Sequence, residues 1–477
     1  MQPLSVKGSC SLEGVPLSFL NSCLETNEKK WFELRDPSAA EFPKKDKILN
    51  DPLYGTIRLA KPLVFLIDLP CFQRLRRIHQ LGFSNLVYPG AHHTRFEHSI
   101  GTAYLSKLFL SNMENNSDDL DGVISSETIL ESQIASLYHD VGHLPYSHVT
   151  ETLLFGNQEI VDIEKSQNLE NVSPHEILSS EFVKGDYISK AIERINTELG
   201  SKLNTASISG LILGKPPEKD KQNRFLGELL HGAVDVDRID YLARDAKYTG
   251  VPFGKIDLGR LVQTITVNKG PEDGLDLVVD IKGIQAIVSL IVARTLMYSS
   301  VYHHHTSRAC SALFQRLLFR FFTNEKINPC ELCNFDDVTL FTKIESHSDY
   351  AVYLNSFIYR IIPKIAIALD GSNLNNIINF ERFTLNLDLK ALIEIESKIN
   401  NNMLLDIPKY AQYDEINMYV KSKKEVKRIS NFSSIAQGVE QYKKQNWIGY
   451  VFYTADSEKV TASAKKYFKD NSVGIRF

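Results

Sequence analysis

The feature that most constrains the fold is a helical pattern that runs into a polar cluster. Leu130, Ile134, Leu137 and Val141 recur at intervals of four, three and four residues, which is typical of one face of a helix. The segment at residues 139–148 follows directly and reads HDVGHLPYSH. The sequence therefore predicts a helix that delivers several imidazoles and a carboxylate to one place.

Histidines are concentrated in this part of the chain. Of thirteen in 477 residues, seven lie within residues 79–148, and only His347 follows residue 305. Because positions four apart share a helix face, we expect His139 and His143 to face one pocket. An adjacent imidazole and Asp140 carboxylate suit a divalent metal of intermediate hardness. A lone His-Asp pair is more often a surface or capping pair, so it needs support from elsewhere.

Two other segments supply that support. Residues 94–101, TRFEHSIG, place His98 at the head of a second helix. Residues 235–245, DVDRIDYLARD, place Asp237, Tyr241 and Asp245 on one helical face. Ligands from three helices, in the order H…HD…D, are the pattern of the HD-domain metal phosphohydrolases.

Taken together, the motifs resemble one branch of that group. They are NDPLYG at 50–55, FQRLRRIHQLG at 72–82, VYPGAHHTRFEHSIG at 87–101, HDVGHLPYSH at 139–148, DVDRIDYLARD at 235–245, and R-x-x-x-Y-x-x-x-Y-x-H at 294–304. In this order and spacing they are similar to the HD-domain deoxynucleoside triphosphate (dNTP) triphosphohydrolases, which include the catalytic core of the vertebrate SAM-and-HD-domain enzyme. We expect no SAM domain, because the N-terminal extension is short and lacks a helical pattern.

The resemblance implies a role for each matching residue. It implies one divalent metal ion per subunit, of manganese, iron, magnesium or zinc, held by His98, His139, Asp140 and Asp237. It implies a catalytic group of His143, His148, His175 and Glu151, in which His175 protonates the leaving group and Glu151 replaces the aspartate of the family. Substrate contacts are expected from Arg95, Gln80, Leu81, Arg238, Tyr241, Asp245, Arg294, Tyr302 and His304.

The implied reaction is attack at the α-phosphorus of a dNTP, which releases deoxynucleoside and inorganic triphosphate. Five residues match positions that bind an activating guanine nucleotide between subunits in allosteric members: Lys47, Asn50, Asp68, Gln73 and Arg76. These imply a GTP or dNTP activator and a homo-oligomer, either a tetramer or a dimer. The alternative for Arg76 and its neighbouring arginines is a solvated or salt-bridged helix.

The chain divides into three expected parts. Residues 1–49 read as an irregular extension, residues 50–322 as a mainly α-helical HD-domain core with small β elements, and residues 323–477 as an α+β region. We expect strands at 56–59 and 447–453 and loops at 157–171 and 214–220. The basic run at 421–428 is expected to be a solvated helix face, which we favour over a nucleic-acid contact.

Composition excludes several classes of protein. With 54 basic and 58 acidic residues, the net charge of −4 argues against nucleic-acid binding by bulk charge. The most apolar run, residues 284–293, ends at Arg294 and is too short to span a membrane. Six cysteines make no disulfide framework, and Cys330 and Cys333 are expected to be unlinked thiols. These features favour a cytoplasmic protein.

Two other functions fit part of the pattern. An HD-domain nuclease or phosphodiesterase would use the same metal ligands on nucleic acid or a cyclic nucleotide. A nucleotide sensor without activity would keep the pocket, although the complete ligand set argues against it. The residues do not predict the preferred base.

Overall fold

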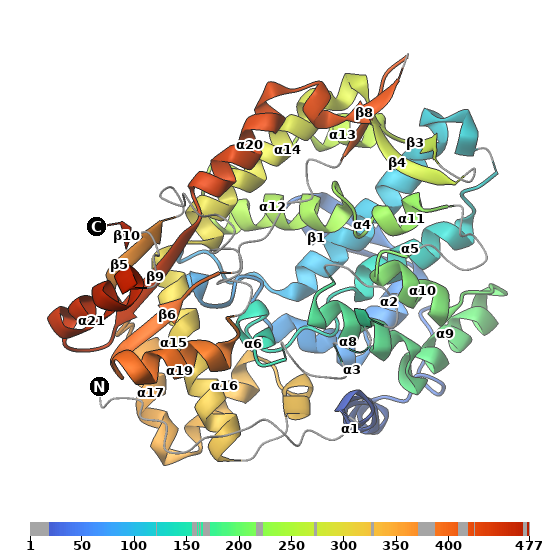
Figure 1. The fold of residues 1–477 in the computed structure, drawn as a ribbon. Helices are drawn as coiled ribbons and strands as arrows, with labels where there is room; N and C mark the ends of the chain where they lie inside the picture. Colours follow the sequence, from blue (N-terminus) through green and yellow to red (C-terminus); the bar gives the residue numbers. More distant parts are fainter. Residues whose placement is uncertain are drawn as a thin grey trace.

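The computed structural model describes residues 19–120, 122–154, 160, 162, 164–165, 172–215, 223–270, 274–325, 329–370, 387–408, 418–423, 425–470 and 475–476. Within them the fold is mainly α-helical with small sheets, which confirms the predicted class (Figure 1). The expected loops at 157–171 and 214–220 fall largely outside the described residues. The domain limits at residues 50 and 323 remain predictions.

The helices that surround the site come from residues 61 to 324. They are α2 (Lys61–Ile67), α3 (Pro70–Gln73), α4 (Arg95–Met113), α5 (Ser126–Tyr138), α6 (His148–Glu151), α8 (Pro174–Lys184), α9 (Asp186–Leu199), α10 (Thr205–Ile212), α11 (Phe225–Glu228), α12 (Val236–Thr249), α13 (Leu258–Thr264), α14 (Ile284–Met297) and α15 (His305–Asn324). The other helices are α1 (Phe19–Leu34), α16 (Asp337–Glu345), α17 (Ser348–Ile358), α19 (Leu389–Ile399), α20 (Ser434–Gln445) and α21 (Ser457–Asp470).

Side-chain caps determine where the site helices begin. Thr94 and Glu97 form a capping box at the start of α4, and Ser173 and Glu176 form another at α8. The carboxylate of Asp235 accepts the Arg238 backbone N–H and caps α12. Each cap lies two to four residues from an expected site residue, so the helix starts fix where those side chains enter the pocket.

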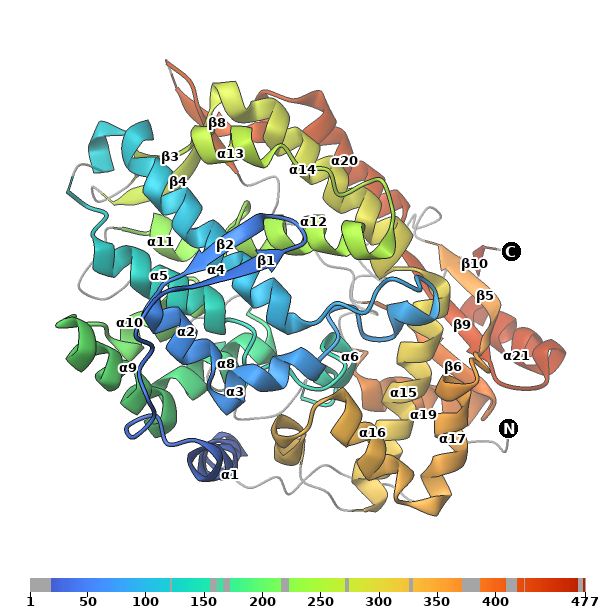
Figure 2. The same cartoon turned by 180° about the vertical axis from the view of Figure 1, so that it is seen from behind.

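Three sheets accompany the helices. Strands β1 (Lys47–Asp51) and β2 (Gly55–Leu59) form an antiparallel hairpin, which Figure 2 shows lying across α4. A second sheet has the order β3-β4-β7-β8, in which β7 (Tyr419–Lys421) and β8 (Val426–Arg428) join β3 (Ile265–Lys269) and β4 (Leu275–Asp280). The third has the order β10-β5-β9-β6, from Ile475–Arg476, Lys364–Asp370, Ile448–Tyr453 and Met403–Asp406, and packs against α19 and α21.

Two sequence expectations about local structure were wrong. The N-terminal extension contains α1, whose Trp31 is buried against Phe182 and Tyr187 although the helix has only a weak apolar stripe. The basic run at 421–428 contributes to two strands, not a helix, because pairing with β4 outweighs its weak helical pattern. The strands expected at 56–59 and 447–453 are confirmed as β2 and β9.

One helical stretch, Ile281–Tyr302, is long and apolar enough to cross a membrane by length and composition, although the sequence led us to expect no such segment. Half of its most apolar window is buried inside the protein. The same stretch supplies Arg294 and Tyr302 to the main polar cavity. Packing as a core helix therefore accounts for its apolar composition.

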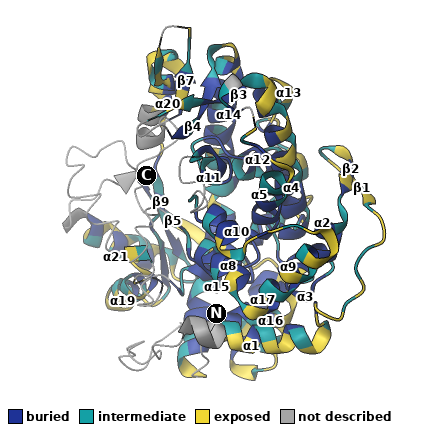
Figure 3. Cartoon of the chain, turned by 90° about the vertical axis from the view of Figure 1, so that its right-hand side faces the viewer, coloured by how far each residue is buried: buried dark blue, intermediate teal, exposed yellow. Residues whose placement is uncertain are grey.

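Buried arginines on α15 attach the C-terminal sheet to the helical core. Arg316 forms a buried ion pair with Glu396 of α19 at 2.5 Å and donates to the Leu405 carbonyl at 2.6 Å. Arg308 donates to the Ile448 carbonyl at 2.6 Å. Leu404 and Phe452 of the C-terminal strands belong to the main hydrophobic core, whereas other residues of these strands form a second core with α19 and α21. Figure 3 shows buried positions in both the helices and these strands.

We predict that Glu396→Ala lowers the free energy of unfolding by about 3–5 kcal/mol, because it leaves the buried Arg316 guanidinium without its counter-charge. Thermal and denaturant unfolding would measure the loss. Glu425→Ala, which breaks the exposed pair with Lys427, is the matched control and should cost less than about 1 kcal/mol. Equal effects of the two substitutions would contradict this assignment.

Candidate metal and phosphohydrolase site

The four expected metal ligands lie together where α4, α5 and α12 meet. The Nε2 atom of His98 lies 2.9 Å from Asp237 Oδ1 and 3.6 Å from Asp140 Oδ2. The Nε2 atom of His139 lies 3.4 Å from Asp140 Oδ1 and 3.5 Å from Asp237 Oδ1. Both histidines and Asp140 are buried. Two imidazoles and two carboxylates therefore converge on one point.

The other nitrogen of each histidine is already bonded. His98 Nδ1 lies 2.8 Å from Asp240 Oδ2, and His139 Nδ1 lies 2.7 Å from the Ser136 carbonyl oxygen. These acceptors require a proton on Nδ1, so Nε2 carries the lone pair whenever the ring is neutral. Partners of this kind commonly orient histidine ligands of metals.

The residues fit a bound cation. The buried Nε2 atoms of His98 and His139 make no hydrogen bond of acceptable geometry, although carboxylate oxygens lie close to both. Burial disfavours the charged imidazole of His98, yet Asp237 and Asp240 outweigh it and raise its pKa to about 10. The negative charge that holds this proton also suits the site to a divalent metal. A His/Asp ligand set does not select one metal.

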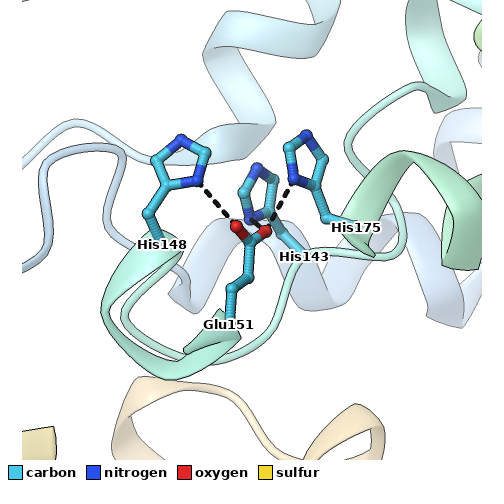
Figure 4. A group of neighbouring side chains, drawn as sticks. All are labelled: His143, His148, Glu151 and His175. Atoms are coloured by element: carbon cyan, nitrogen blue, oxygen red, sulfur yellow. Dashed lines mark hydrogen bonds and ion pairs between the residues drawn. The ribbon is translucent and has the colours of Figure 1, made fainter. Parts of the chain in front are cut away.

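A second cluster lies beside the first and is centred on Glu151 (Figure 4). His175 Nδ1 lies 2.6 Å from Glu151 Oε1, and His148 Nδ1 lies 2.9 Å from Oε2. His143 Nδ1 lies 3.3 Å from Oε1, and its ring stacks on that of His175 with centroids 3.8 Å apart. The expected catalytic group is thus one contiguous cluster, in which only His148 is exposed.

Electrostatics distinguish the members of this cluster. Burial opposes charge on His175, but the Glu151 carboxylate outweighs it and raises the pKa of His175 to about 9. Burial and the positive charges of Arg95 and His175 hold the pKa of His143 well below its usual value. Although burial opposes it, His175 and His148 keep the pKa of Glu151 well below normal. The favoured state is a protonated His175, a neutral His143 and an ionised Glu151.

A cavity of about 420 Å³ opens onto both clusters, within the roughly 300–1,000 Å³ typical of small-molecule sites. Its lining comes from six separate segments of the chain and includes most of the predicted substrate residues. Its walls include Gln80, Leu81, Arg95, Asp140, His148, His175, Asp237, Arg238, Tyr241, Asp245, Arg294 and Tyr302.

Polar contacts hold several of these walls in place. Arg95 donates to Asp140 Oδ2 at 2.9 Å and to Ser147 Oγ at 3.0 Å. Tyr302 donates to Asp245 Oδ2 at 2.7 Å. His93 Nε2 lies 2.7 Å from the other oxygen of Asp245, so His93 helps to hold this wall in place.

One predicted substrate contact is not supported by the structure. His303, not His304, lines the cavity. The Nδ1 atom of His304 accepts the Thr306 backbone N–H and caps α15, while its ring stacks on His305. The preceding turn, Tyr298–Tyr302, is π-helical, so the direction of each following side chain departs from regular helical spacing.

The helix expected to carry both His139 and His143 ends earlier than predicted, since α5 stops at Tyr138. His143 lies in the following turn, where its carbonyl accepts two N–H groups of the buried Arg74. Because of this turn, the His139 side chain points into the metal-ligand set and the His143 side chain points into the Glu151 cluster. The two histidines therefore occupy adjoining clusters and are not equivalent.

The five predicted regulatory residues do not line the cavity and form two local groups. Lys47 lies 3.7 Å from Asp68, and Asn50 lies beside Thr56 in the hairpin. Gln73 accepts the Arg76 Nε–H at 2.8 Å. Arg76 also lies over the Phe96 ring at 3.5 Å, so part of its charge is used locally.

Sequence reasoning missed two residues of the site. Asp240 supports His98, and its position three residues after Asp237 on one helix was the available signal. His231 lines the cavity and lies 2.9 Å from Glu176. It lies between α11 and α12, and no spacing pattern marks it.

Comparison with known proteins agrees with the geometry. The chain matches the HD domain over residues 95–245 and the HD associated region over residues 256–473. It is 30% identical over 433 residues to the uncharacterized protein MJ1154 of Methanocaldococcus jannaschii, spanning 89% of this chain and 82% of that protein. This chain belongs to the HD-domain family. It is an HD-type hydrolase with His/Asp groups that could hold a metal.

Relatives with a named activity match the HD region only. The deoxynucleoside triphosphate triphosphohydrolase SAMHD1 of Gallus gallus is 33% identical over 227 residues, which are 46% of this chain and 36% of that protein. A crystal structure of a hypothetical protein from Aquifex aeolicus shares the fold. It has a TM-score of 0.65 and 24% identity, covering 88% of this chain and all of that one.

We predict that His98→Ala weakens binding of Mn²⁺ or Co²⁺ by more than about 100-fold, because it removes a ligand and not merely a group that orients one. Isothermal titration calorimetry on metal-free protein would measure the change. The exposed His92 is the matched control, and His92→Ala should bind metal like the unsubstituted protein. Unchanged affinity in His98→Ala would contradict the assigned site.

Proposed function

We propose that the protein is a metal-dependent dNTP triphosphohydrolase, which converts a dNTP to deoxynucleoside and inorganic triphosphate. The observation that carries the proposal is the shared cavity, which exposes the ligand set, the His175–Glu151 pair and three arginines together. The similarity to SAMHD1, whose name states this activity, also supports it.

Arginines account for binding of the polyanion. Arg95, Arg238 and Arg294 lie on the cavity wall, and a triphosphate needs several charge-assisted hydrogen bonds as water is excluded. The same groups stabilise charge that develops on the phosphoryl oxygens. A metal held by the four ligands would supply an activated water and polarise a phosphoryl oxygen.

His175 is the proposed proton donor to the departing 5′-oxygen. Its Nδ1 is held by Glu151, which leaves Nε2 as the nitrogen directed away from the carboxylate. The Glu151 side chain is one carbon longer than the aspartate of the family and still reaches His175 at 2.6 Å. The substitution therefore preserves the pairing that orients a general acid.

Tyr302 and Asp245 are proposed to frame the sugar. The Tyr302 hydroxyl is tied to Asp245, and Asp245 is held in turn by His93. A tyrosine ring fixed in this way can lie under the deoxyribose and leave no room for a 2′-hydroxyl. Selection against ribonucleotides would follow from this steric exclusion.

We also propose activation by GTP or a dNTP at Lys47, Asn50, Asp68, Gln73 and Arg76. Lys47, Asn50 and Arg76 are exposed, as binding between copies of the chain requires. Assembly into a homo-oligomer, a tetramer or a dimer, is part of this proposal.

The first test is product analysis with each dNTP, with and without GTP. We predict release of inorganic triphosphate and deoxynucleoside, with a higher rate when GTP is present. Ion-exchange chromatography separates triphosphate from monophosphate and diphosphate. Cleavage of oligonucleotides or cyclic nucleotides without triphosphate release would favour the nuclease or phosphodiesterase reading.

The second test separates catalysis from binding. We predict that Glu151→Gln lowers kcat by about 10²–10⁴-fold with little change in KM, because His175 loses the charge that holds its proton. Steady-state kinetics measure both constants. Glu181→Gln, at a half-buried position that pairs with Lys184 on the same helix as His175, is the control and should match the unsubstituted enzyme. An equal loss in both variants would exclude a specific role for Glu151.

A further inference from the structure

A buried chain of hydrogen bonds connects the metal ligand His98 to the β1–β2 hairpin. Its centre is Asp240, whose two oxygens accept from three residues. Oδ2 lies 2.8 Å from His98 Nδ1 and 2.8 Å from Arg244 Nε, while Oδ1 lies 2.9 Å from Arg244 Nη2. The Tyr54 hydroxyl donates to Oδ1 at 2.8 Å. The acceptor capacity of this carboxylate is therefore fully used.

Arg244 carries the connection to the hairpin. It is fully buried, and its Nη1 donates to Asp51 Oδ2 at 2.9 Å. The other oxygen of Asp51 accepts the backbone N–H groups of Leu53 and Tyr54, at 2.7 and 3.1 Å. The Asp51 carboxylate thus stabilises the hairpin turn and also binds Arg244. A rigid guanidinium joins two carboxylates in fixed directions, which a flexible lysine does not.

The side chains of Asp51, Arg244 and Asp240, which we call the relay, are packed so that they cannot move independently of their neighbours. Gly101 on α4 lies against Asp240 and Arg244, and a Cβ atom there would clash with both side chains. The ring of Tyr54 packs beside that of Tyr104, with centroids 5.1 Å apart. A displacement of the hairpin turn must therefore move the Asp240 carboxylate or break a buried charged hydrogen bond.

We propose that Asp240 and Arg244 are positioning residues that make the orientation of His98 depend on the hairpin. The Asp51–Arg244–Asp240 relay fixes the orientation of the His98 ring, so displacement of the hairpin lowers the affinity of the site for metal. By thermodynamic reciprocity, bound metal stabilises the hairpin turn. This inference rests on the proposed metal site and needs no assumption about substrate or activator.

The test measures metal affinity directly. Metal-free protein is titrated with Co²⁺, and both the dissociation constant and the visible spectrum of the bound ion are recorded. Tyr54→Phe removes one hydrogen bond to Asp240 and should weaken binding by about 3- to 10-fold. Asp240→Asn should weaken it by about 10- to 100-fold, as expected for a direct partner of a ligand. Both should shift the Co²⁺ absorption bands.

The control is Tyr104→Phe, which removes a hydroxyl from the neighbouring ring and should leave affinity and spectrum unchanged. Circular dichroism confirms that each variant is folded. If Tyr54→Phe binds Co²⁺ like Tyr104→Phe, with the same spectrum, the proposed relay is wrong even though the metal site stands. If the unsubstituted protein binds no Co²⁺, the metal site itself fails.

Hydrogen exchange tests the reverse direction. Co²⁺ should slow amide exchange of a peptide covering residues 51–58 in the unsubstituted protein, because the Leu53 and Tyr54 amides are bonded to Asp51. The slowing should be smaller in Tyr54→Phe and unchanged in Tyr104→Phe. If Co²⁺ does not change the amide exchange rate of this peptide, the proposed coupling is wrong.

Discussion

The site depends on one buried carboxylate, that of Asp140, which lies between the two histidine clusters. It accepts a hydrogen bond from Arg95 at 2.9 Å, and three other imidazoles besides the neighbouring His139 lie within 3.9 Å of it. Burial alone would raise the pKa of Asp140, but Arg95 and His139 keep it well below normal. A buried anion in this place draws cationic groups and, when present, a metal toward one point. The helices that supply those groups are thereby tied to the same centre.

The same constraint explains why local structure around the site is so closely specified. His98, His139 and Asp237 reach the centre from α4, the end of α5 and α12, and a capping side chain precedes each of these three helices. Arg74 holds the turn that follows α5 through the His143 carbonyl. The C-terminal strands contribute to the main hydrophobic core and contact α15, but His/Asp ligands come only from residues 98–237 among those described. The C-terminal strands therefore support the site by packing, and they supply none of its His/Asp ligands among the described residues.

The resemblance of the sequence motifs to the HD-domain family implied the ligand set and the His175–Glu151 pair, and the structure brings the residues of each set close together. The exchange of His303 for His304 was not predictable, since a π-helical turn changes the side-chain direction without a sequence signal. Helix α1 was missed because a few long-range contacts, of Trp31 with Phe182 and of Phe32 with Tyr187, hold it in place, and not a strong apolar stripe. His231 and the relay through Arg244 depend on long-range contacts, which spacing along one chain does not reveal.

The central claim is that the metal-binding set and the His175–Glu151 pair act on one phosphorus, the one bonded to the 5′-oxygen. Hydrolysis of a dNTP in water labelled with ¹⁸O tests this most directly, with mass spectrometry of both products. Attack at the α-phosphorus places one heavy oxygen in the inorganic triphosphate and none in the deoxynucleoside. Label in the deoxynucleoside, or in released monophosphate or diphosphate, would contradict the account.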